Sequence, residues 1–389
     1  MGKLKICLLN DSFPPLIDGV ANTVKNYADI LTEVCGDEVL VATPRYPGGD
    51  YSGYPYPVVA YQSLNTARVT AGYRMGNSYS PEALFKIREF RPDIIHAHCP
   101  FSSLLLGKHA RSLTKAPLIF TYHTKFDYDI ARAIKYKLIQ KTVVKGLIGF
   151  IGIADEIWTV SEGAGESLKE LGYKGEYKIM NNGVDFPKGP VNDELVKEVT
   201  KGYDLPQNVP VFIFVGRMFR YKGLPLIMDT LKNLHEKGID FRMVFIGDGT
   251  DLQYLKDKTA EYDLEHKVLI LGKIMDRQIL RAWYTRGDLF LFPSVYDTNG
   301  IVVREAAACG LASVLIKGSC AAEGISSKVN GYLIDENIES FTNVLEELSS
   351  QIPEMRKAGA NAMNQIYVSW KDAVLTARVS YEELLRKRK

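Results

Sequence analysis

Short apolar runs alternate with longer stretches of helical spacing along almost the whole chain. In the first half, runs of strand length occur at residues 4–9, 38–42, 93–98, 117–122, 156–160 and 177–180. The stretch 20–34 has its apolar residues on one face of a helix: Val20, Val24, Tyr27, Ala28 and Leu31. Strands that alternate with helices build parallel sheets covered on both faces, so the pattern predicts an α/β fold.

The pattern starts again in the second half, with strand-length runs at 211–215, 242–246, 268–271, 289–292 and 312–316. The segment 184–208 between the halves is polar, with proline and glycine at both ends, which is typical of a connection. A chain of 389 residues is long enough for two domains with a core each. We expect a Rossmann-like domain at 1–183, a linker at 184–208, a second Rossmann-like domain at 209–370 and a C-terminal helix at 371–389 that can cross back to the first domain.

The predicted architecture also predicts where ligands bind. Open parallel sheets bind them at the carboxyl ends of their strands. Two doubly wound domains that face each other would enclose a deep cleft at those ends. The polar motifs described below mostly follow predicted strands, so we expect the functional site there.

Composition restricts the compartment and the partners. The five cysteines are odd in number and show no C-x-x-C spacing, which argues against a disulfide framework or a zinc site and favours a reducing, cytoplasmic compartment. The N-terminus reads as a first strand rather than a signal peptide, and no window approaches the roughly 20 apolar residues of a membrane span. A net charge of +2 gives no sign of a nucleic-acid partner, and we expect none.

Basic residues directly follow the first strand of the second half. The sequence after VFIFV is GRMFRYKG, residues 216–223, which contains Arg217 and Lys222. Arginine offers a planar fork to phosphate oxygens and lysine offers a point charge, so one interpretation is a diphosphate clamp. The other is a solvated basic loop before a helix, and the loop by itself does not decide between the two.

Two carboxylates eight positions apart follow a later strand of this half. Asp297 precedes a turn at Asn299-Gly300, and Glu305 lies in the helical run that continues to Gly310. Free backbone N–H groups at a helix start favour a bound anion. Glu305, one turn further on, can accept hydrogen bonds from a diol such as a ribose. Each acid taken alone would be interpreted as a surface charge or a helix cap.

Together these residues resemble glycosyltransferase family 4, whose members have the GT-B fold of two Rossmann-like domains facing each other across a cleft. The family signature is an arginine and a lysine after the first strand of the second domain, then E-x7-E. Here the second part is D-x7-E, with Asp297 at its first position. The resemblance implies that Arg217 and Lys222 hold the donor pyrophosphate and that Glu305 holds the ribose. It also implies donor-sugar contacts from Asp297 and from the backbone of Gly300, Ile301 and Val302.

Further positions match the family in both halves. Gly247 lies in a G-x-G loop expected near the nucleotide, and Lys273 and Ile274 match the strand end beside the base. In the first half, Gly19 is where the backbone of the family approaches the donor phosphate, and Asp18 replaces a second glycine. A glycine at such a turn would allow positive φ and a close approach.

Three histidines follow strands of the first half. His96 and His98 end one predicted strand, and His123 follows the next. A lone histidine at a strand end is more often structural than functional. The resemblance implies that His123 lies beside the transferring sugar, as in related lipid glycosyltransferases. We interpret His96 as structural and leave the role of His98 open.

The resemblance implies transfer with retention of configuration and without a bound metal or other cofactor. The nucleotide diphosphate gains negative charge as it leaves, and preorganised positive groups stabilise that charge. The expected catalytic residues are Arg217, Lys222, His123 and Asp297. The D-x-D motif at 127–129, which binds a metal ion in the other main glycosyltransferase fold, lies far in sequence from the clamp, so we interpret it as a coincidence of composition.

A basic segment follows His123. Residues 130–150 contain no acidic residue, and they include five basic ones: Arg132, Lys135, Lys137, Lys141 and Lys145. A helix of this kind can lie on an anionic membrane, and each basic residue contributes about 1 kcal/mol near the surface. With Phe126, these residues are the expected membrane and acceptor surface, on the inner face of the plasma membrane. An ordinary amphipathic helix with a solvated lysine face is the alternative.

The leading hypothesis is a retaining hexosyltransferase that moves glucose from UDP-glucose to a membrane lipid such as diacylglycerol. A family 4 enzyme that acts on a soluble or polyprenyl-linked glycan is the first alternative. A nucleotide-sugar epimerase and an inactive sugar-nucleotide-binding protein are alternatives of another class. The arginine–lysine pair with D-x7-E argues against the epimerase, and the substitutions at Asp18 and Asp297 are what would favour the inactive protein.

Overall fold

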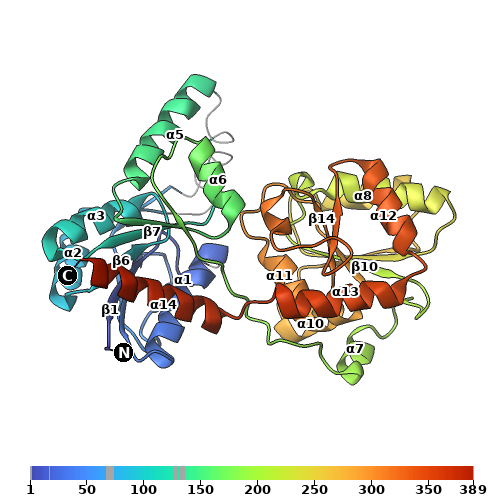
Figure 1. The fold of residues 1–389 in the computed structure, drawn as a ribbon, viewed down its shortest axis with the longest axis horizontal. Coiled ribbons are helices and arrows are strands. Elements are labelled where there is room, and N and C mark those ends of the chain that lie inside the picture. Colours follow the sequence, from blue (N-terminus) through green and yellow to red (C-terminus); the bar gives the residue numbers. More distant parts are fainter. Residues whose placement is uncertain (1, 17, 67–73, 127–129, 131–135, 389) are drawn as a thin grey trace. The chain divides into compact units, whose positions relative to one another are not determined.

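The computed structural model describes all residues except 1, 17, 67–73, 127–129, 131–135 and 389. The chain forms two compact units (Figure 1). Unit 1 contains Met1–Asn182 and Trp370–Lys389, and unit 2 contains Gly183–Ser369. Each unit is built around one large parallel sheet, which confirms the predicted α/β class.

The sheet of unit 1 has seven strands in the order β3-β2-β1-β6-β7-β8-β9, and each neighbouring pair is parallel. Its strands are β1 (Lys5–Leu9), β2 (Glu38–Pro44), β3 (Val58–Tyr61), β6 (Ile94–Ala97), β7 (Leu118–Tyr122), β8 (Glu156–Thr159) and β9 (Lys178–Ile179). Strand β7 is buried at every position, as expected for a parallel strand covered on both faces. The strand order reverses between β1 and β6, where doubly wound sheets bind ligands.

The helices of unit 1 are α1 (Gly19–Glu33), α2 (Pro81–Phe90), α3 (Ser102–Thr114), α5 (Lys137–Ile151), α6 (Glu162–Glu170) and α14 (Trp370–Lys387). A short antiparallel pair joins β4 (Ser63–Asn65) and β5 (Arg74–Gly76). The predicted helix at 20–34 is confirmed as α1, which buries the side chains of Val24, Tyr27, Ala28 and Leu31.

The sheet of unit 2 has the order β12-β11-β10-β13-β14-β15, again with a reversal beside its first strand. Its strands are β10 (Val211–Val215), β11 (Arg242–Ile246), β12 (Val268–Gly272), β13 (Leu289–Leu291), β14 (Ser313–Ile316) and β15 (Tyr332–Ile334). Its helices are α7 (Asp193–Val199), α8 (Leu224–Glu236), α9 (Leu252–Glu261), α10 (Arg277–Arg286), α11 (Ile301–Ala308), α12 (Ile338–Leu348) and α13 (Ile352–Gln365), with 3₁₀ turns η1 (Arg220–Lys222) and η2 (Cys320–Ala322).

The segment 184–208 lies within unit 2, where α7 packs against α10. The chain enters and leaves unit 2 on adjacent stretches of backbone. The Val184 N–H donates to the Val368 carbonyl at 3.0 Å, and a parallel bridge pairs Val184 with Ser369. The chain then continues into α14, which belongs to unit 1.

Helix α14 packs along α1 in unit 1 (Figure 1). Arg378 of α14 donates from Nε and Nη2 to the two carboxylate oxygens of Asp37, at 2.8 and 3.1 Å. Asp37 is fully buried and also accepts the Leu4 backbone N–H at 2.9 Å. This ion pair therefore ties the C-terminal helix to the start of the central strand.

Replacing Arg378 with alanine is expected to lower the free energy of unfolding by about 3–5 kcal/mol, because Asp37 would remain as an unpaired buried carboxylate. Arg386 lies in the same helix with its side chain 75% exposed, and Arg386→Ala should change the free energy by less than about 1 kcal/mol. Urea denaturation followed by circular dichroism compares the two variants. Equal effects would contradict an anchoring role for the pair.

Candidate active site

At the carboxyl edge of the unit 2 sheet, the loops that follow neighbouring strands touch one another through their backbones. These contacts lie beside β10 and β13, where the strand order reverses. Gly247, after β11, has φ 144°, and a Cβ there would lie 1.8 Å from the Gly216 carbonyl oxygen. Gly223 has φ 85°, and its Cβ would lie 2.4 Å from the Pro293 carbonyl oxygen. Only glycine fits such approaches. The loops after β10, β11 and β13 are therefore held against one another.

This contact brings Lys222 and Asp297 together. The Lys222 ammonium lies 2.5 Å from Asp297 Oδ1, and its side chain is only 12% exposed. Ser294 Oγ donates to the other carboxylate oxygen of Asp297 at 2.5 Å. Lys222 follows β10 and Asp297 follows β13, the two strands that flank the reversal. A positioned, largely buried cation thus lies where a doubly wound sheet binds its ligand.

Glu305 in α11 is the second carboxylate of the predicted pair. Arg277 Nη2 donates to its Oε1 at 2.7 Å, and the buried Tyr284 hydroxyl donates to its Oε2 at 3.2 Å. Burial raises the pKa of Glu305, and the guanidinium of Arg277 opposes that shift. The Arg277 guanidinium also lies over the Phe186 ring, 4.1 Å from its centroid. Glu305 is therefore a desolvated acceptor held in a set orientation.

The other predicted donor-site residues lie at the same edge. Arg217 is exposed, with its guanidinium 5.2 Å from the centroid of the Phe219 ring. In the loop after β12, Lys273 is exposed and Ile274 is half-buried. Helix α11 begins at Gly300 with φ 59° and with no side-chain cap from the described residues. Its first backbone N–H groups form an anion-binding helix start.

In unit 1, the three histidines lie at the carboxyl ends of β6 and β7. His96 is fully buried between two hydroxyl groups, with Nδ1 2.7 Å from Tyr381 Oη and Nε2 2.7 Å from Thr121 Oγ1. His98 Nδ1 lies 3.0 Å from His123 Nε2, and their rings are stacked. His96 thus has a structural environment, whereas His98 contacts the predicted functional histidine directly.

Burial lowers the pKa of His96 and His98 well below the ordinary value, and the neighbouring histidines lower both further. Burial also lowers the pKa of His123 to about 3. The three imidazoles are therefore neutral at physiological pH. His98 Nε2 is buried and has no hydrogen-bond partner among the described residues. Because a buried N–H without an acceptor is rarer than a buried lone pair, the geometry favours donation from His98 Nδ1 to His123 Nε2.

The surroundings of Gly19 differ from the expectation. Gly19 opens α1 without positive φ, and a Cβ there would meet nothing within 4 Å. The expectation of positive φ at Gly19 is therefore wrong, whereas its close approach to a donor phosphate stays a prediction. Asp18 Oδ1 accepts the N–H groups of Val20 and Ala21 at 2.7 and 2.9 Å. The donors that a phosphate would use at this helix start are already bonded to a carboxylate.

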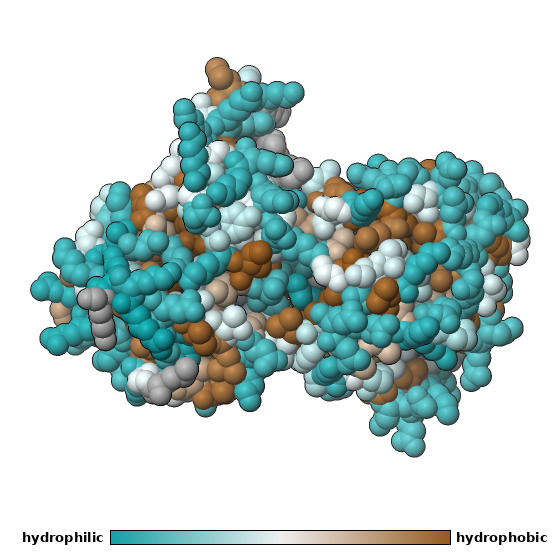
Figure 2. Space-filling model, viewed as in Figure 1, coloured by the Kyte–Doolittle hydropathy of each residue, from teal (hydrophilic) through white to brown (hydrophobic). Residues whose placement is uncertain are grey.

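Helix α5 projects from the body of unit 1 (Figure 1). Lys137, Lys141 and Lys145 are exposed at successive turns, and the Leu138 side chain is 79% exposed beside them. Figure 2 shows hydrophilic and hydrophobic atoms mixed at the end of this projection. Arg132 and Lys135 lie outside the described residues. The exposed face of α5 therefore combines positive charge with apolar side chains.

Phe126 does not belong to that surface. Its side chain is 4% exposed and lies edge-on against Tyr122 in the core of unit 1. The expectation that Phe126 contacts a membrane is wrong, because the ring is buried against the sheet. No helix in the described part of the chain is long and apolar enough to span a membrane.

Among the described residues, no cluster of three or more His, Cys, Asp or Glu side chains is placed to hold a metal ion. Asp127 and Asp129 of the D-x-D motif lie outside the described residues. The five cysteines are free thiols.

Some neighbours of the predicted residues had no signal of their own in the sequence. Arg277 follows Asp276 at the start of α10 and reaches Glu305 across 28 positions. Tyr284 lies in an apolar stretch of the same helix, and Ser294 directly follows the β13 segment. Ser294 could have been found from the sequence, because it is a polar residue at the end of a predicted strand. The contacts of Arg277 and Tyr284 could not, because they depend on how α10 packs against α11.

Two family models match the chain in succession. Residues 17–187 match "Glycosyltransferase Family 4", and residues 196–365 match "Glycosyl transferases group 1". The chain belongs to glycosyltransferase family 4. It is therefore a glycosyltransferase with the GT-B fold, as the sequence motifs predicted.

Several known proteins are similar to this glycosyltransferase. The alpha-monoglucosyldiacylglycerol synthase of Streptococcus pneumoniae is 24% identical, over 91% of this chain and 80% of its own length. A galactosyltransferase of Escherichia coli that acts on an N-acetylglucosamine-diphosphoundecaprenol is 28% identical, over 68% of both chains. The crystal structure of HepE from Anabaena in complex with UDP-glucose matches with a TM-score of 0.72 at 17% identity, over 99% of this chain and 100% of HepE.

The buried histidines predict how stability depends on pH. The unfolded chain protonates histidine near pH 6.5, whereas folded His96 and His98 stay neutral, so below about pH 6.5 the unfolded state binds more protons. Stability is therefore expected to fall as the pH falls, by about 1 kcal/mol per pH unit for each histidine. Urea denaturation between about pH 7.5 and 5.5 measures this slope.

His98→Asn should give a shallower slope than the wild-type protein, whatever its stability at neutral pH. His266 is exposed, so His266→Asn is the matched control and should leave the slope unchanged. A slope in His98→Asn as steep as that of the wild type would contradict the neutral, buried state of His98.

Proposed function

We propose that this glycosyltransferase transfers a hexose, with glucose from UDP-glucose as the first candidate, to a membrane lipid such as diacylglycerol. The observation that carries the proposal is the Lys222–Asp297 pair, a largely buried cation at the ligand-binding edge of the unit 2 sheet. The UDP-glucose complex of HepE supports the donor, and the name of the pneumococcal relative supports the acceptor.

In this proposal the donor binds to the carboxyl edge of unit 2. Arg217 and Lys222 hold the pyrophosphate together with the helix start at Gly300, and Glu305 accepts the ribose hydroxyls. Arg277 and Tyr284 each donate to one oxygen of Glu305, and since a carboxylate has about four acceptor sites, each oxygen can accept one further hydrogen bond. Arg277 can also shift to make room, because its side chain is 45% exposed and Asp185 lies 3.9 Å away as a second carboxylate partner.

Lys222 then stabilises the leaving group. Charge grows on the β-phosphate as the glycosidic bond breaks, and a cation already in position needs little reorganisation. Asp297 fixes that ammonium through one carboxylate oxygen, and Ser294 holds the carboxylate by donating to the other oxygen. We assign Asp297 the orientation of Lys222 in addition to the sugar contact that the family resemblance implies.

Retention follows from attack on the same face of the sugar. The acceptor oxygen bonds to the anomeric carbon as the bond from that carbon to the phosphate oxygen breaks, and a phosphate oxygen takes the acceptor proton. The sugar becomes oxocarbenium-like on the way. His123 is a neutral imidazole with a pKa of about 3, so it hydrogen-bonds a sugar hydroxyl and does not serve as the base.

A polyprenyl-linked glycan is the second candidate acceptor, supported by the undecaprenol-linked substrate in the name of the Escherichia coli relative. Membership of family 4 removes the epimerase from consideration. Donor hydrolysis by the purified protein in the absence of acceptor would exclude an inactive binder.

Lys222→Ala is expected to lower kcat by about 10²–10³-fold while raising the Kd for UDP by no more than about tenfold, because the lysine acts most strongly on charge that develops in the transition state. Initial rates with UDP-glucose and a lipid extract give kcat, and calorimetry gives Kd. Lys256→Ala, an exposed lysine on α9, is the matched control and should change neither. Equal losses of turnover and binding would contradict the proposed role.

The triple variant Lys137→Gln, Lys141→Gln, Lys145→Gln tests the lipid acceptor. If α5 lies on the membrane, loss of about 1 kcal/mol per lysine should weaken binding to phosphatidylglycerol vesicles about 100-fold. The control removes three exposed lysines of unit 2, Lys188, Lys201 and Lys256, for the same change in net charge. Equal sedimentation of both variants with the vesicles would argue for a soluble acceptor.

A further inference from the structure

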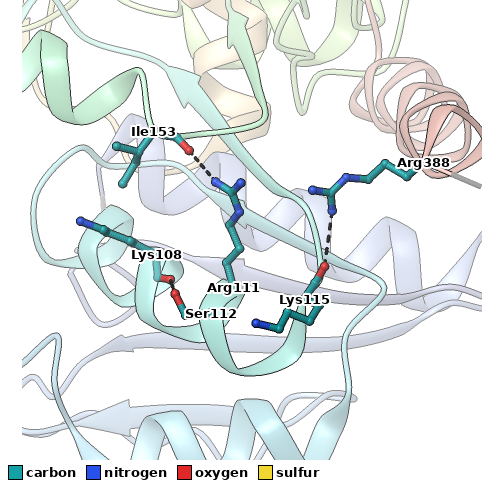
Figure 3. Close-up of a pocket in the computed structure, with 6 residues that line it drawn as sticks. All are labelled: Lys108, Arg111, Ser112, Lys115, Ile153 and Arg388. Atoms are coloured by element: carbon teal, nitrogen blue, oxygen red, sulfur yellow. Dashed lines mark hydrogen bonds between the residues drawn. The ribbon is translucent and has the colours of Figure 1, made fainter.

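Unit 1 contains a basic pocket away from the candidate active site. It has a volume of about 690 Å³ and is lined by Lys108, Arg111, Ser112, Lys115, Ile153 and Arg388 (Figure 3). Lys115 ends α3 just before β7, and Asp155 directly precedes β8. The pocket therefore lies at the amino ends of these strands. His98 and His123 follow the carboxyl ends of β6 and β7, at the opposite edge of the sheet.

Two guanidinium groups of the pocket are held in place by the protein. Arg111 Nη1 donates to the Ile153 carbonyl at 2.6 Å, and its Nη2 lies 3.0 Å from Asp155 Oδ1. Arg388 Nη2 donates to the same oxygen at 3.1 Å, and its Nη1 donates to the Lys115 carbonyl at 3.4 Å (Figure 3). Asp155 is itself fixed by the backbone N–H of Leu118, at 2.8 Å. The arginines are therefore preorganised although their side chains remain partly exposed.

The charges of the pocket do not cancel. Four cations line it, Asp155 supplies one negative charge, and the C-termini of α3 and α14 supply about half a negative charge each. About two positive charges remain. If the basic residues served only to neutralise the two helix C-termini, about one positive charge would be enough, and the pocket has four. Within the described part of the chain, Lys108 and Lys115 make no ion pair.

We propose that this pocket binds a phosphate group, carried either by a free phosphate compound or by an anionic lipid headgroup, separately from the donor site. Planar guanidinium forks match phosphate oxygens, and the two lysines can close on the anion as mobile point charges. A dianionic phosphate balances the excess charge. The volume leaves room for the group to which the phosphate is attached.

Calorimetric titration with inorganic pyrophosphate tests the site. The wild-type protein is expected to bind two equivalents, one at the donor site and one in this pocket. Lys222→Ala should weaken the first by no more than about tenfold and leave the second unchanged. The double variant Lys108→Gln, Lys115→Gln should keep the first and bind the second about tenfold more weakly, as expected when two point charges are removed from a phosphate contact.

The matched control is Lys188→Gln, Lys201→Gln, which makes the same change in net charge on exposed lysines of unit 2. The proposal is overturned if the pocket variant weakens no bound equivalent, or if this control weakens it as much as the pocket variant does. If the wild-type protein binds a single equivalent that the pocket variant weakens and Lys222→Ala does not, the proposed donor site is overturned and the pocket stands, so the two failures are distinguishable.

Vesicles identify the source of the phosphate. Sedimentation compares the pocket variant with the wild-type protein on phosphatidylcholine vesicles with and without phosphatidic acid. Weaker binding of the variant to the phosphatidic acid vesicles alone supports a lipid headgroup. Unchanged vesicle binding together with weakened pyrophosphate binding supports a free phosphate compound. If the pocket variant binds both pyrophosphate and phosphatidic acid vesicles as tightly as the wild-type protein does, the pocket is not a phosphate site.

Discussion

The ion pair between Lys222 and Asp297 is the interaction on which the proposed donor site depends. An ammonium group on a side chain that is only 12% exposed has lost much of its hydration, and the carboxylate of Asp297 compensates for that loss at 2.5 Å. An arriving diphosphate brings a second counter-charge to the same ammonium. In the proposed mechanism the site is therefore arranged before the donor binds, and binding would add negative charge to a cation whose desolvation has already been compensated.

The two units use opposite electrostatic arrangements at equivalent places in their sheets. In unit 2, Lys222 and Asp297 beside the strand reversal are charged and paired, whereas in unit 1 the histidines that follow β6 and β7 are neutral and hydrogen-bond each other. Burial maintains that neutrality, because it lowers the pKa of His98 well below its ordinary value. A neutral hydrogen-bonding surface suits the hydroxyl groups of a sugar and an acceptor, while the paired charges suit a phosphate.

Most of the sheet architecture could be predicted from the sequence, because parallel strands buried on both faces appear as continuous apolar runs. The runs at 211–215 and 242–246 coincide with β10 and β11. Strands β3 and β15 were not predicted, since runs of four and three residues at the sheet edges carry little apolar signal. The carboxylate contacts were also beyond prediction, because Glu305 meets Arg277 only through the packing of two helices.

The substitution of aspartate for the family glutamate acquires a physical meaning from these contacts. An aspartate at position 297 lies close enough to receive Lys222 and Ser294 on separate oxygens, at 2.5 Å each. A glutamate would carry its carboxylate one methylene further than this arrangement. In the proposed mechanism the shorter acid therefore orients the lysine in addition to contacting the sugar. In the same proposal the first backbone N–H groups of α11, which no side chain of the described residues caps, are fixed donors for the pyrophosphate.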